Sequence, residues 1–172
     1  MEDYMKISDT LLPEFDMEMA TTRKCLARIP DDKLSFKPHP KSFDMGGLAT
    51  HIATMVDWGA STIQSDNFDY APVGGEPYVP PVVKTNAELL ALFDSGLVKF
   101  RAALAAAEND ALMAPWSLLA GGKTIFTMPR VAVLRGMIFN HLVHHRGQLS
   151  VYLRLCDIPV PAIYGPSADE AS

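Results

Sequence analysis

Cysteine and clustered charge are both scarce in this chain. Only Cys25 and Cys156 occur among the 172 residues. Two thiols are too few for a disulfide framework, so we expect both to be reduced and mostly buried. The net charge is −5 and no basic cluster occurs. This balance argues against nucleic acid as a partner, because binding to phosphates requires clustered lysine and arginine.

Long hydrophobic runs are absent as well. No apolar stretch approaches the roughly 20 residues that a membrane-spanning helix needs, so we expect no membrane partner. The first residues, Met1 to Tyr4, lack the basic and then apolar segments of a signal peptide, which favours the cytoplasm. Hydrophobic residues make up 48% of the chain and charged residues 20%, which is typical of one globular domain over residues 1–172.

Several motifs of familiar enzyme classes are also missing. The His-x-x-x-His pair at His141 and His145 has Leu142 where a metalloprotease carries its catalytic glutamate. The Glu-x-x-His motifs of di-iron bundles are absent, which argues against an oxygen-activating carboxylate site. Neither a glycine-rich phosphate loop nor a Gly-x-Ser-x-Gly elbow occurs, so we expect neither nucleotide binding nor serine-hydrolase chemistry.

Four segments show the apolar spacing of three and four residues that is typical of amphipathic helices. Thr85 and Glu88 form a capping box at the start of the third segment, where each side chain can satisfy a free amide. The predicted helices run from about Tyr4 or Pro13 to Ile29, from Asp44 to Ser65, from Thr85 to about Glu108, and from Pro129 to Cys156.

Two connections shape the predicted fold. The segment from Asp66 to Lys84 is rich in proline and glycine and long enough to cross a bundle, so the second and third helices would run parallel. Residues 115–127 are typical of a small β-hairpin that turns at Gly121 and Gly122. We therefore predict an all-α four-helix bundle with a long crossover between helices 2 and 3 (up-down-down-up) and a small β-hairpin before helix 4.

The segment from Asn140 to Gln148 contains three of the five histidines of the chain. His141 and His145 are four residues apart, and four helical steps of about 100° return a side chain to within about 40° of its starting direction. The two imidazoles therefore share one face, one turn apart, which suits two ligands of one metal ion. His144 points about 100° away from His145 and is set aside.

A metal ion needs further ligands, and His51 is the natural third one. It interrupts the apolar stripe of the second helix between Leu48 and Met55. Taken singly, a lone histidine is more often a hydrogen-bonded core residue, and a lone His-x-x-x-His pair is a weak motif. The combination favours a metal, because buried unpaired polar groups are costly and one ion would satisfy all three imidazoles.

Side chains near these histidines on the same stripes are candidates for the wall of a pocket: Met55, Trp58, Met137, Gln148 and Tyr152. Gln148 is also within reach of His145 and could orient it. Arg146 points away from the stripe and is expected in an ion pair or a subunit contact. Gly147 is expected to permit close approach of a neighbouring helix.

Three neutral ligands would leave coordination positions open, which is typical of catalytic rather than structural zinc. The helix stripes carry no obvious carboxylate base. This absence favours activation of a thiol, which needs no general base once it is coordinated, over activation of water. A metal-dependent hydrolase, a non-catalytic metal or small-molecule binding module, and a purely structural bundle are the alternatives.

The chain resembles the DinB/YfiT-like family of small metal-binding four-helix bundles. The resemblance covers nearly the whole chain. Its specific parts are Lys37 to Ser42, Leu48 to Ala53, Asn140 to Gln148, Tyr152 to Arg154, and Tyr164 to Glu170.

This resemblance implies a set of functional expectations. In the family, a histidine of the second helix and a His-x-x-x-His pair before Arg-Gly-Gln hold the metal, and these positions correspond to His51, His141 and His145. Members are commonly homodimers and bind nickel or zinc. Some relatives are transferases or isomerases that use low-molecular-weight thiols, and others are named hydrolases or DNA-damage-inducible proteins of the stress response. The resemblance therefore implies a small-molecule substrate, and possible partners include a cellular thiol.

Overall fold

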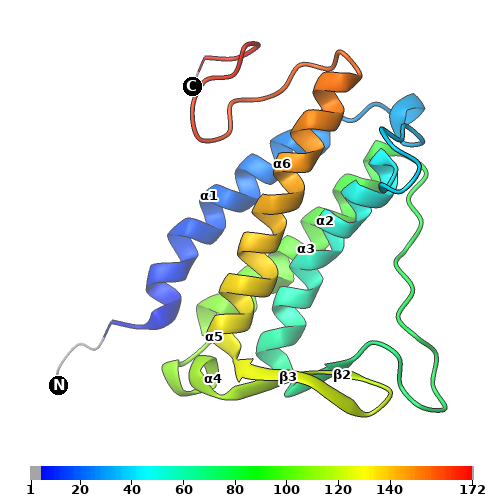
Figure 1. Cartoon of the computed structure of the whole chain (residues 1–172). Coiled ribbons are helices and arrows are strands. Elements are labelled where there is room, and N and C mark those ends of the chain that lie inside the picture. The colour runs from blue at the N-terminus through cyan, green and yellow to red at the C-terminus, as the bar shows by residue number, and fades with distance from the viewer. Residues whose placement is uncertain (1–4, 172) are drawn as a thin grey trace.

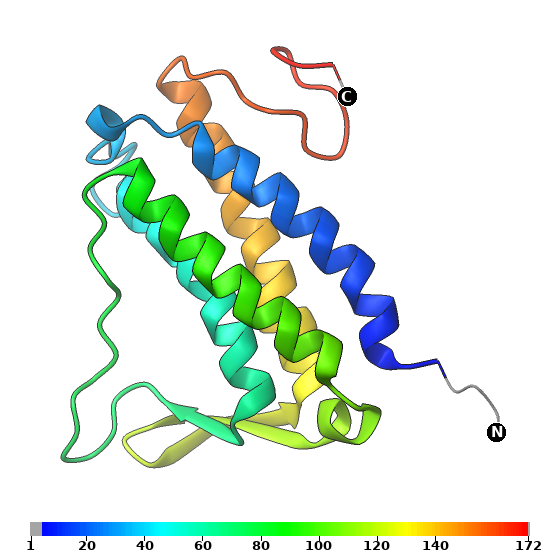
Figure 2. The same cartoon turned by 180° about the vertical axis from the view of Figure 1, so that it is seen from behind.

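Four long helices lie side by side in the structure, a computed structural model that describes residues 5–171 (Figures 1 and 2). In Figure 1, α1 and α6 run upward, whereas α2 and α3 run downward. The mainly helical architecture expected from the sequence is confirmed. The alternative start of the first helix at Tyr4 lies outside the described residues. The four helices are α1 (Ile7–Ala27), α2 (Met45–Gln64), α3 (Asn86–Ala106) and α6 (Asn140–Leu155).

Capping side chains start α2 and α3 close to the positions predicted. The carboxylate of Asp44 accepts a hydrogen bond from Gly47 N at 2.7 Å, which satisfies one of the free amides of the first turn of α2. The hydroxyl of Thr85 accepts from Glu88 N at 3.2 Å. The carboxylate of Glu88 in turn accepts from Lys84 N at 2.7 Å, one residue before the expected amide.

A three-stranded sheet closes one end of the helices, so the prediction of an isolated hairpin was incomplete. Strands β2 (Pro115–Ala120) and β3 (Lys123–Pro129) form the expected antiparallel hairpin, and β1 (Asn67–Asp69) pairs with β2 in parallel. Gly121 and Gly122 both have positive φ, 60° and 74°, as a tight hairpin turn requires. The carboxylate of Asp69 accepts hydrogen bonds from both glycine amides, at 3.1 and 2.7 Å, and so ties the long connection to the hairpin.

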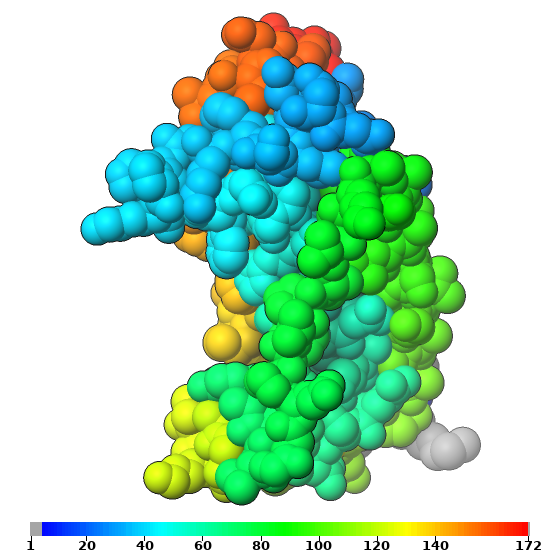
Figure 3. Space-filling model, turned by 90° about the vertical axis from the view of Figure 1, so that its right-hand side faces the viewer, coloured from blue at the N-terminus to red at the C-terminus, as the bar shows by residue number. Residues whose placement is uncertain are grey.

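The connection from β1 to α3 then runs along the molecule to its opposite end (Figures 1 and 3). Tyr78 N donates to Tyr70 O at 2.9 Å, which holds the first part of the connection beside the sheet. A short 3₁₀ turn, η1 (Asp31–Lys33), and one short helix, α4 (Asn109–Met113), complete the other connections. None of the helices among residues 5–171 is both long and apolar enough to span a membrane.

Helices α2 and α3 approach each other closely because glycine lies at two of their contacts. A Cβ atom added to Gly59 would lie 2.2 Å from the ring of Phe100, and one added to Gly96 would lie 2.6 Å from Val56. Phe100 in turn packs edge-on against Phe15 of α1, with ring centroids 4.9 Å apart. The buried core thus joins α1, α2 and α3. Gly147, in contrast, is exposed and has open space around it, so the prediction of close helix approach there was wrong.

The sequence suggested one continuous last helix, but the structure divides it into three segments. It begins as α5 (Arg130–Val133), widens into a π-helical segment, η2 (Leu134–Phe139), and continues as α6. Asn140 N donates to Arg135 O, five residues earlier. A wider turn of this kind displaces backbone carbonyls from their usual donors and is frequent at functional sites. It ends at Phe139, two residues before His141.

Candidate metal centre

Three histidines converge between α2 and α6. Their ring nitrogens lie within 4.8 Å of one another. His141 Nε2 is 3.4 Å from His51 Nε2 and 2.8 Å from His145 Nε2. His145 is buried, and the other two rings are half-buried. The structure therefore brings together the three residues that the helical stripes had predicted, although His51 and His141 are 90 positions apart in the chain.

Hydrogen bonds at the far side of two of the rings fix which nitrogen faces the centre. His145 Nδ1 lies 2.7 Å from the side-chain oxygen of Gln148, which can only accept. His141 Nδ1 lies 3.2 Å from Met137 O, a carbonyl of the π-helical segment. Both Nδ1 atoms are therefore the donors, which leaves both Nε2 atoms facing the centre. Partners of this kind are the ones that orient histidine ligands in metal sites.

Aromatic rings enclose His51. Phe43 stacks on its imidazole with ring centroids 6.1 Å apart and an angle of 24°, and Trp58 packs edge-on at 5.5 Å. Burial, followed by the nearby His145 and His141, lowers the pKa of His51 to about 4. The pKa of His145 is also lowered, mainly by burial, although its hydrogen bond to Gln148 opposes the shift. Both rings are therefore neutral at pH 7, as metal ligation requires.

The donor set fits a divalent metal ion. The Nε2 atoms of His141 and His145 are 2.8 Å apart, so a proton or a metal ion must lie between them. Nitrogens bound tetrahedrally to zinc at about 2.0–2.1 Å lie roughly 3.3 Å apart, close to the 3.4 Å between His51 and His141 and longer than the 2.8 Å between His141 and His145. Among the described residues, no aspartate, glutamate or cysteine belongs to this cluster. The three histidines could thus hold a metal ion as an all-nitrogen, uncharged site.

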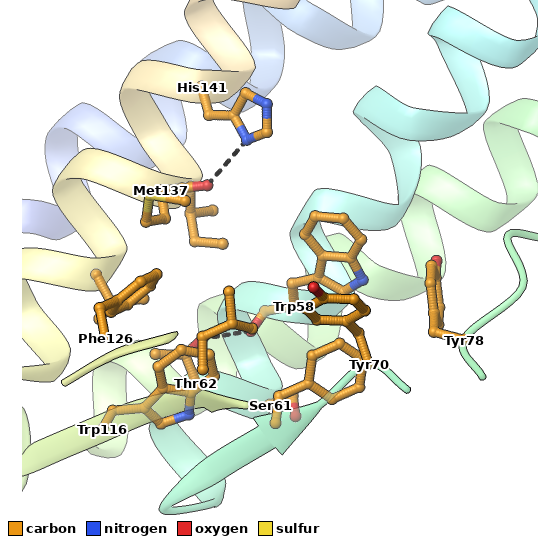
Figure 4. A pocket seen from close by; sticks show the side chains of 13 residues that line it. Trp58, Ser61, Thr62, Tyr70, Tyr78, Trp116, Phe126, Met137 and His141 are labelled. Carbon is orange, nitrogen blue, oxygen red and sulfur yellow. Dashed lines mark hydrogen bonds between the residues drawn. The ribbon is translucent and has the colours of Figure 1, made fainter. Parts of the chain in front are cut away.

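A cavity of about 360 Å³ opens beside His141 (Figure 4). It lies between the lower part of α2, the sheet and the start of the last long helix. Figure 4 shows Met137 and His141 on one side and Trp58, Tyr70 and Tyr78 on the other. Six of its 13 lining residues are aromatic: Trp58, Phe68, Tyr70, Tyr78, Trp116 and Phe126.

A second hollow, of about 450 Å³, borders His51 on the other side of the cluster. Ser35, Asp44 and Thr50 give it a more polar wall than that of the aromatic cavity. In the space-filling view, the surface is indented beneath the overhang of the segment around residue 40, and gold atoms of the last long helix lie behind it (Figure 3). The histidine cluster thus lies between two hollows of different character.

The remaining predicted pocket residues divide into two groups. Trp58 and Met137 line the aromatic cavity, and Gln148 contacts His145. Met55, in contrast, is fully buried in the hydrophobic core, because its position on α2 faces the helix interface. Tyr152 packs against Phe36 and donates to Phe43 O at 3.1 Å, so it supports the segment before α2 rather than the cavity wall.

Sequence reasoning missed most of the aromatic wall. Five of its six rings come from the long connection and the sheet, where no helical stripe could point to them. The available signal was composition: Phe68, Tyr70 and Tyr78 are large aromatic residues in a segment otherwise rich in proline and glycine. Phe43, which stacks on His51, gave no comparable signal. It lies before the Asp44 cap and therefore outside the helical stripe of α2.

Arg146 lies on the opposite side of α6 from the histidines and forms an ion pair, one of its two predicted roles. Its guanidinium is 1% exposed and lies 2.6 Å from Glu18 Oε2 of α1. It also donates to Thr22 Oγ1 at 3.2 Å and to the hydroxyl of Tyr164 at 2.8 Å. Tyr164 donates in turn to Glu18 Oε1 at 2.9 Å, so the cluster joins α6, α1 and the C-terminal segment.

Comparison with known proteins agrees with this architecture. The sequence profile of the DinB superfamily matches residues 14–149. This chain belongs to the DinB superfamily. It is 28% identical over 163 residues to the uncharacterized protein YrdA of Bacillus subtilis, a match that covers 94% of this chain and 90% of YrdA.

Two solved structures share the fold. A DinB-like protein from Bacillus cereus superposes with a TM-score of 0.69 at 24% identity, over 94% of this chain and 99% of that protein. The DinB-like protein YjoA from Bacillus subtilis gives a TM-score of 0.68 at 22% identity, over 88% of this chain and 96% of YjoA. At these identities the likeness concerns the fold.

Proposed function

We propose that this protein is a metal-dependent enzyme in which the histidine centre activates a thiol toward a small electrophile. The observation that carries the proposal is the convergence of His51, His141 and His145, with the Nε2 atoms of His141 and His145 2.8 Å apart. Imidazole ligands suit zinc and nickel, which are the metals we expect. The ion would supply an open coordination position and would lower the pKa of a thiol beside it.

The residues around the cluster favour a thiol over water. An attacking water needs a base to accept its proton, and no carboxylate belongs to the histidine cluster among the described residues. Asp57 of α2 lies at a different face, where it pairs with Lys99 of α3 at 3.1 Å. The nearby Asp44 carboxylate, in the hollow beside His51, is used to cap α2 through Gly47 N. This arrangement suits a thiol, which loses its proton on coordination to the metal.

The two hollows suit two different substrates. The aromatic cavity beside His141 would hold the electrophile, and the more polar hollow beside His51 would hold the thiol. Gln148 and Met137 O keep the two Nε2 atoms aimed at the space between the substrates. Phe43 and Trp58 cover His51 and limit the access of water to it. A homodimer and a cytoplasmic location remain predictions.

Turnover measurements on untagged protein test this proposal. Protein loaded with zinc or nickel is mixed with a panel of cellular thiols and the chromogenic electrophile 1-chloro-2,4-dinitrobenzene. We expect thioether formation with at least one thiol, and its loss in the His141→Ala, His145→Ala double variant. His144→Ala is the matched control, because this exposed histidine lies outside the cluster. A wild-type rate no higher than that of the double variant, with every thiol, would rule out the transferase.

A chromogenic ester, tested in parallel without thiol, addresses the hydrolase alternative. Metal-dependent ester cleavage that is lost in the double variant, together with no thiol transfer, would replace the transferase with a hydrolase. Metal binding without either reaction would indicate a binding module.

A further inference from the structure

The aromatic cavity has a composition that selects its ligand. We propose that it binds an uncharged, flat aromatic molecule, and that this molecule is the electrophilic substrate of the proposed reaction. Only the claim that this molecule is a substrate rests on the proposed function. The binding itself depends on the cavity alone.

The wall explains why the ligand would be aromatic. Rings from α2, the connection and the sheet form a chain of edge-to-face contacts: Trp58 and Tyr78 have centroids 5.7 Å apart at 73°, and Tyr78 and Phe68 lie 6.0 Å apart at 79°. Opposite them, Trp116 and Phe126 have centroids 6.2 Å apart. Ring faces and edges arranged in this way gain most from contact with another flat ring, because aromatic pairs prefer offset or edge-to-face geometry.

The charge and volume of the cavity restrict the ligand further. No aspartate, glutamate, lysine or arginine is among the described residues that line it. In the metal-free protein a charged group placed there would lose its hydration without a counter-charge, so the cavity itself favours a neutral molecule. An apolar cavity of about 150 Å³ accepts one benzene ring. A cavity of about 360 Å³ therefore has room for a bicyclic or a substituted single ring.

Trp116 contributes its ring to the wall and not its N–H. Its side chain lines the cavity and is 6% exposed. Its indole nitrogen is buried and lies at the edge of the ring that points away from Met137 and His141 (Figure 4). A ligand in the cavity would therefore contact the ring alone. The position of His141 in the same wall would place the bound molecule beside the histidine cluster.

The tryptophans make the binding directly observable. The chain has two tryptophans, Trp58 and Trp116, and both line the cavity. The probes are 2-naphthol, naphthalene, 2-naphthoate and cyclohexanol, which vary the polarity, the charge and the aromatic ring in turn, titrated in EDTA so that no metal ion binds the carboxylate. Intrinsic fluorescence gives the dissociation constant, and the two indole N–H signals in a ¹⁵N–¹H correlation spectrum report on each tryptophan. We expect 2-naphthol and naphthalene to bind more tightly than the other two probes and to shift both signals.

One variant and one control locate the probe. Ser61→Phe fills part of the cavity and should weaken 2-naphthol binding at least tenfold, whereas Ser95→Phe, at an exposed position of α3, should leave it unchanged.

The same titration in the His141→Ala, His145→Ala double variant separates this proposal from the proposed function. Retained 2-naphthol binding there, together with loss of metal, is expected, because most of the wall remains. No 2-naphthol binding to wild-type protein, binding of 2-naphthoate or cyclohexanol with equal affinity, or equal loss in Ser61→Phe and Ser95→Phe would overturn the aromatic-ligand proposal. The metal and thiol assays are unaffected by any of these results.

Discussion

One short segment, Asn140 to Gln148, contributes to two polar clusters on different sides of α6, and they differ in one respect. The guanidinium of Arg146 is paired with the Glu18 carboxylate at 2.6 Å and donates to Thr22 and Tyr164. The Nε2 atoms of His51 and His145 each lie within 3.4 Å of His141 Nε2, with no carboxylate in the cluster among the described residues. The first cluster balances its charges within the chain, and the second offers its ligand atoms to a cation from outside.

This difference separates structure from function within a single motif. A buried charge that is paired and hydrogen-bonded by its own chain holds elements together. A buried set of ligand atoms that only an added ion can satisfy is a binding site. The predictions below test this separation, because each cluster should respond to its own perturbation and be insensitive to the other.

Loss of two histidines should have the largest effect, and it should fall on the metal. In the His141→Ala, His145→Ala variant we expect metal affinity to fall by roughly 10⁴-fold, because each lost ligand costs more than a lost outer partner. Competition with a chelating dye measures this change. Thermal unfolding in excess EDTA should differ little from wild type, and a large loss of stability in EDTA would show that the histidines are structural.

Loss of Arg146 should have the next largest effect, and it should fall on stability. Arg146→Met leaves the Glu18 carboxylate buried and unpaired, so the free energy of unfolding in EDTA should fall by about 3–5 kcal/mol in urea titrations. The double variant with Glu18→Gln should recover part of this loss, because the buried charge is gone.

A matched control exists at the surface. Arg154 pairs with Asp169 at 2.6 Å on the exposed part of α6, and Arg154→Met should cost no more than about 1 kcal/mol. Metal content of folded Arg146→Met protein should stay near that of wild type. If it lost metal as completely as the double histidine variant, the two clusters would not be independent.

A smaller effect is expected for the residue that orients His145. Gln148→Leu removes the acceptor 2.7 Å from Nδ1, and metal affinity should fall about 10- to 100-fold. Gln64→Leu, at the exposed last position of α2, is the matched control and should leave affinity unchanged. Equal affinities for Gln148→Leu and wild type would remove Gln148 from the centre.

The smallest effect concerns pH and the metal-free protein. Burial lowers the pKa of folded His51 to about 4, whereas an unfolded histidine titrates near 6.5. Between these values the unfolded chain binds more protons, so this contribution to stability is present above about pH 6.5 and is lost as the pH falls toward about 4. Urea titrations in EDTA at about pH 7 and about pH 5 should show this loss, and His51→Phe should reduce it. Identical pH dependence in both proteins would contradict the assigned shift.

The sequence predicted the histidine cluster because all three residues lie on regular helices. His141 and His145 lie on one face of α6, and His51 lies on the facing side of α2. The helical period alone therefore predicted that their side chains would meet. The contact between Gln148 and His145 followed from their spacing of three residues on the same helix. The family resemblance pointed to the same residues, and the DinB superfamily match now supports it.

The sequence did not predict the cavity, because its wall depends on tertiary structure. Strand β1 has three residues and no alternation of its own, and it exists because β2 supplies its partner. Tyr70 and Tyr78 reach the cavity through a connection whose course is fixed by Asp69 and the glycine turn. The π-helical segment was also hidden, since Leu134 to Phe139 fits an ordinary helical pattern.

The metal content of untagged protein is the most direct test of the account. Wild type, His144→Ala and the His141→Ala, His145→Ala variant are expressed in medium replete with zinc and nickel and analysed by elemental mass spectrometry. We expect about one divalent ion per chain in the first two proteins and almost none in the third. Less than about a tenth of an equivalent in wild type, or equal content in all three proteins, would contradict a metal centre built by these histidines.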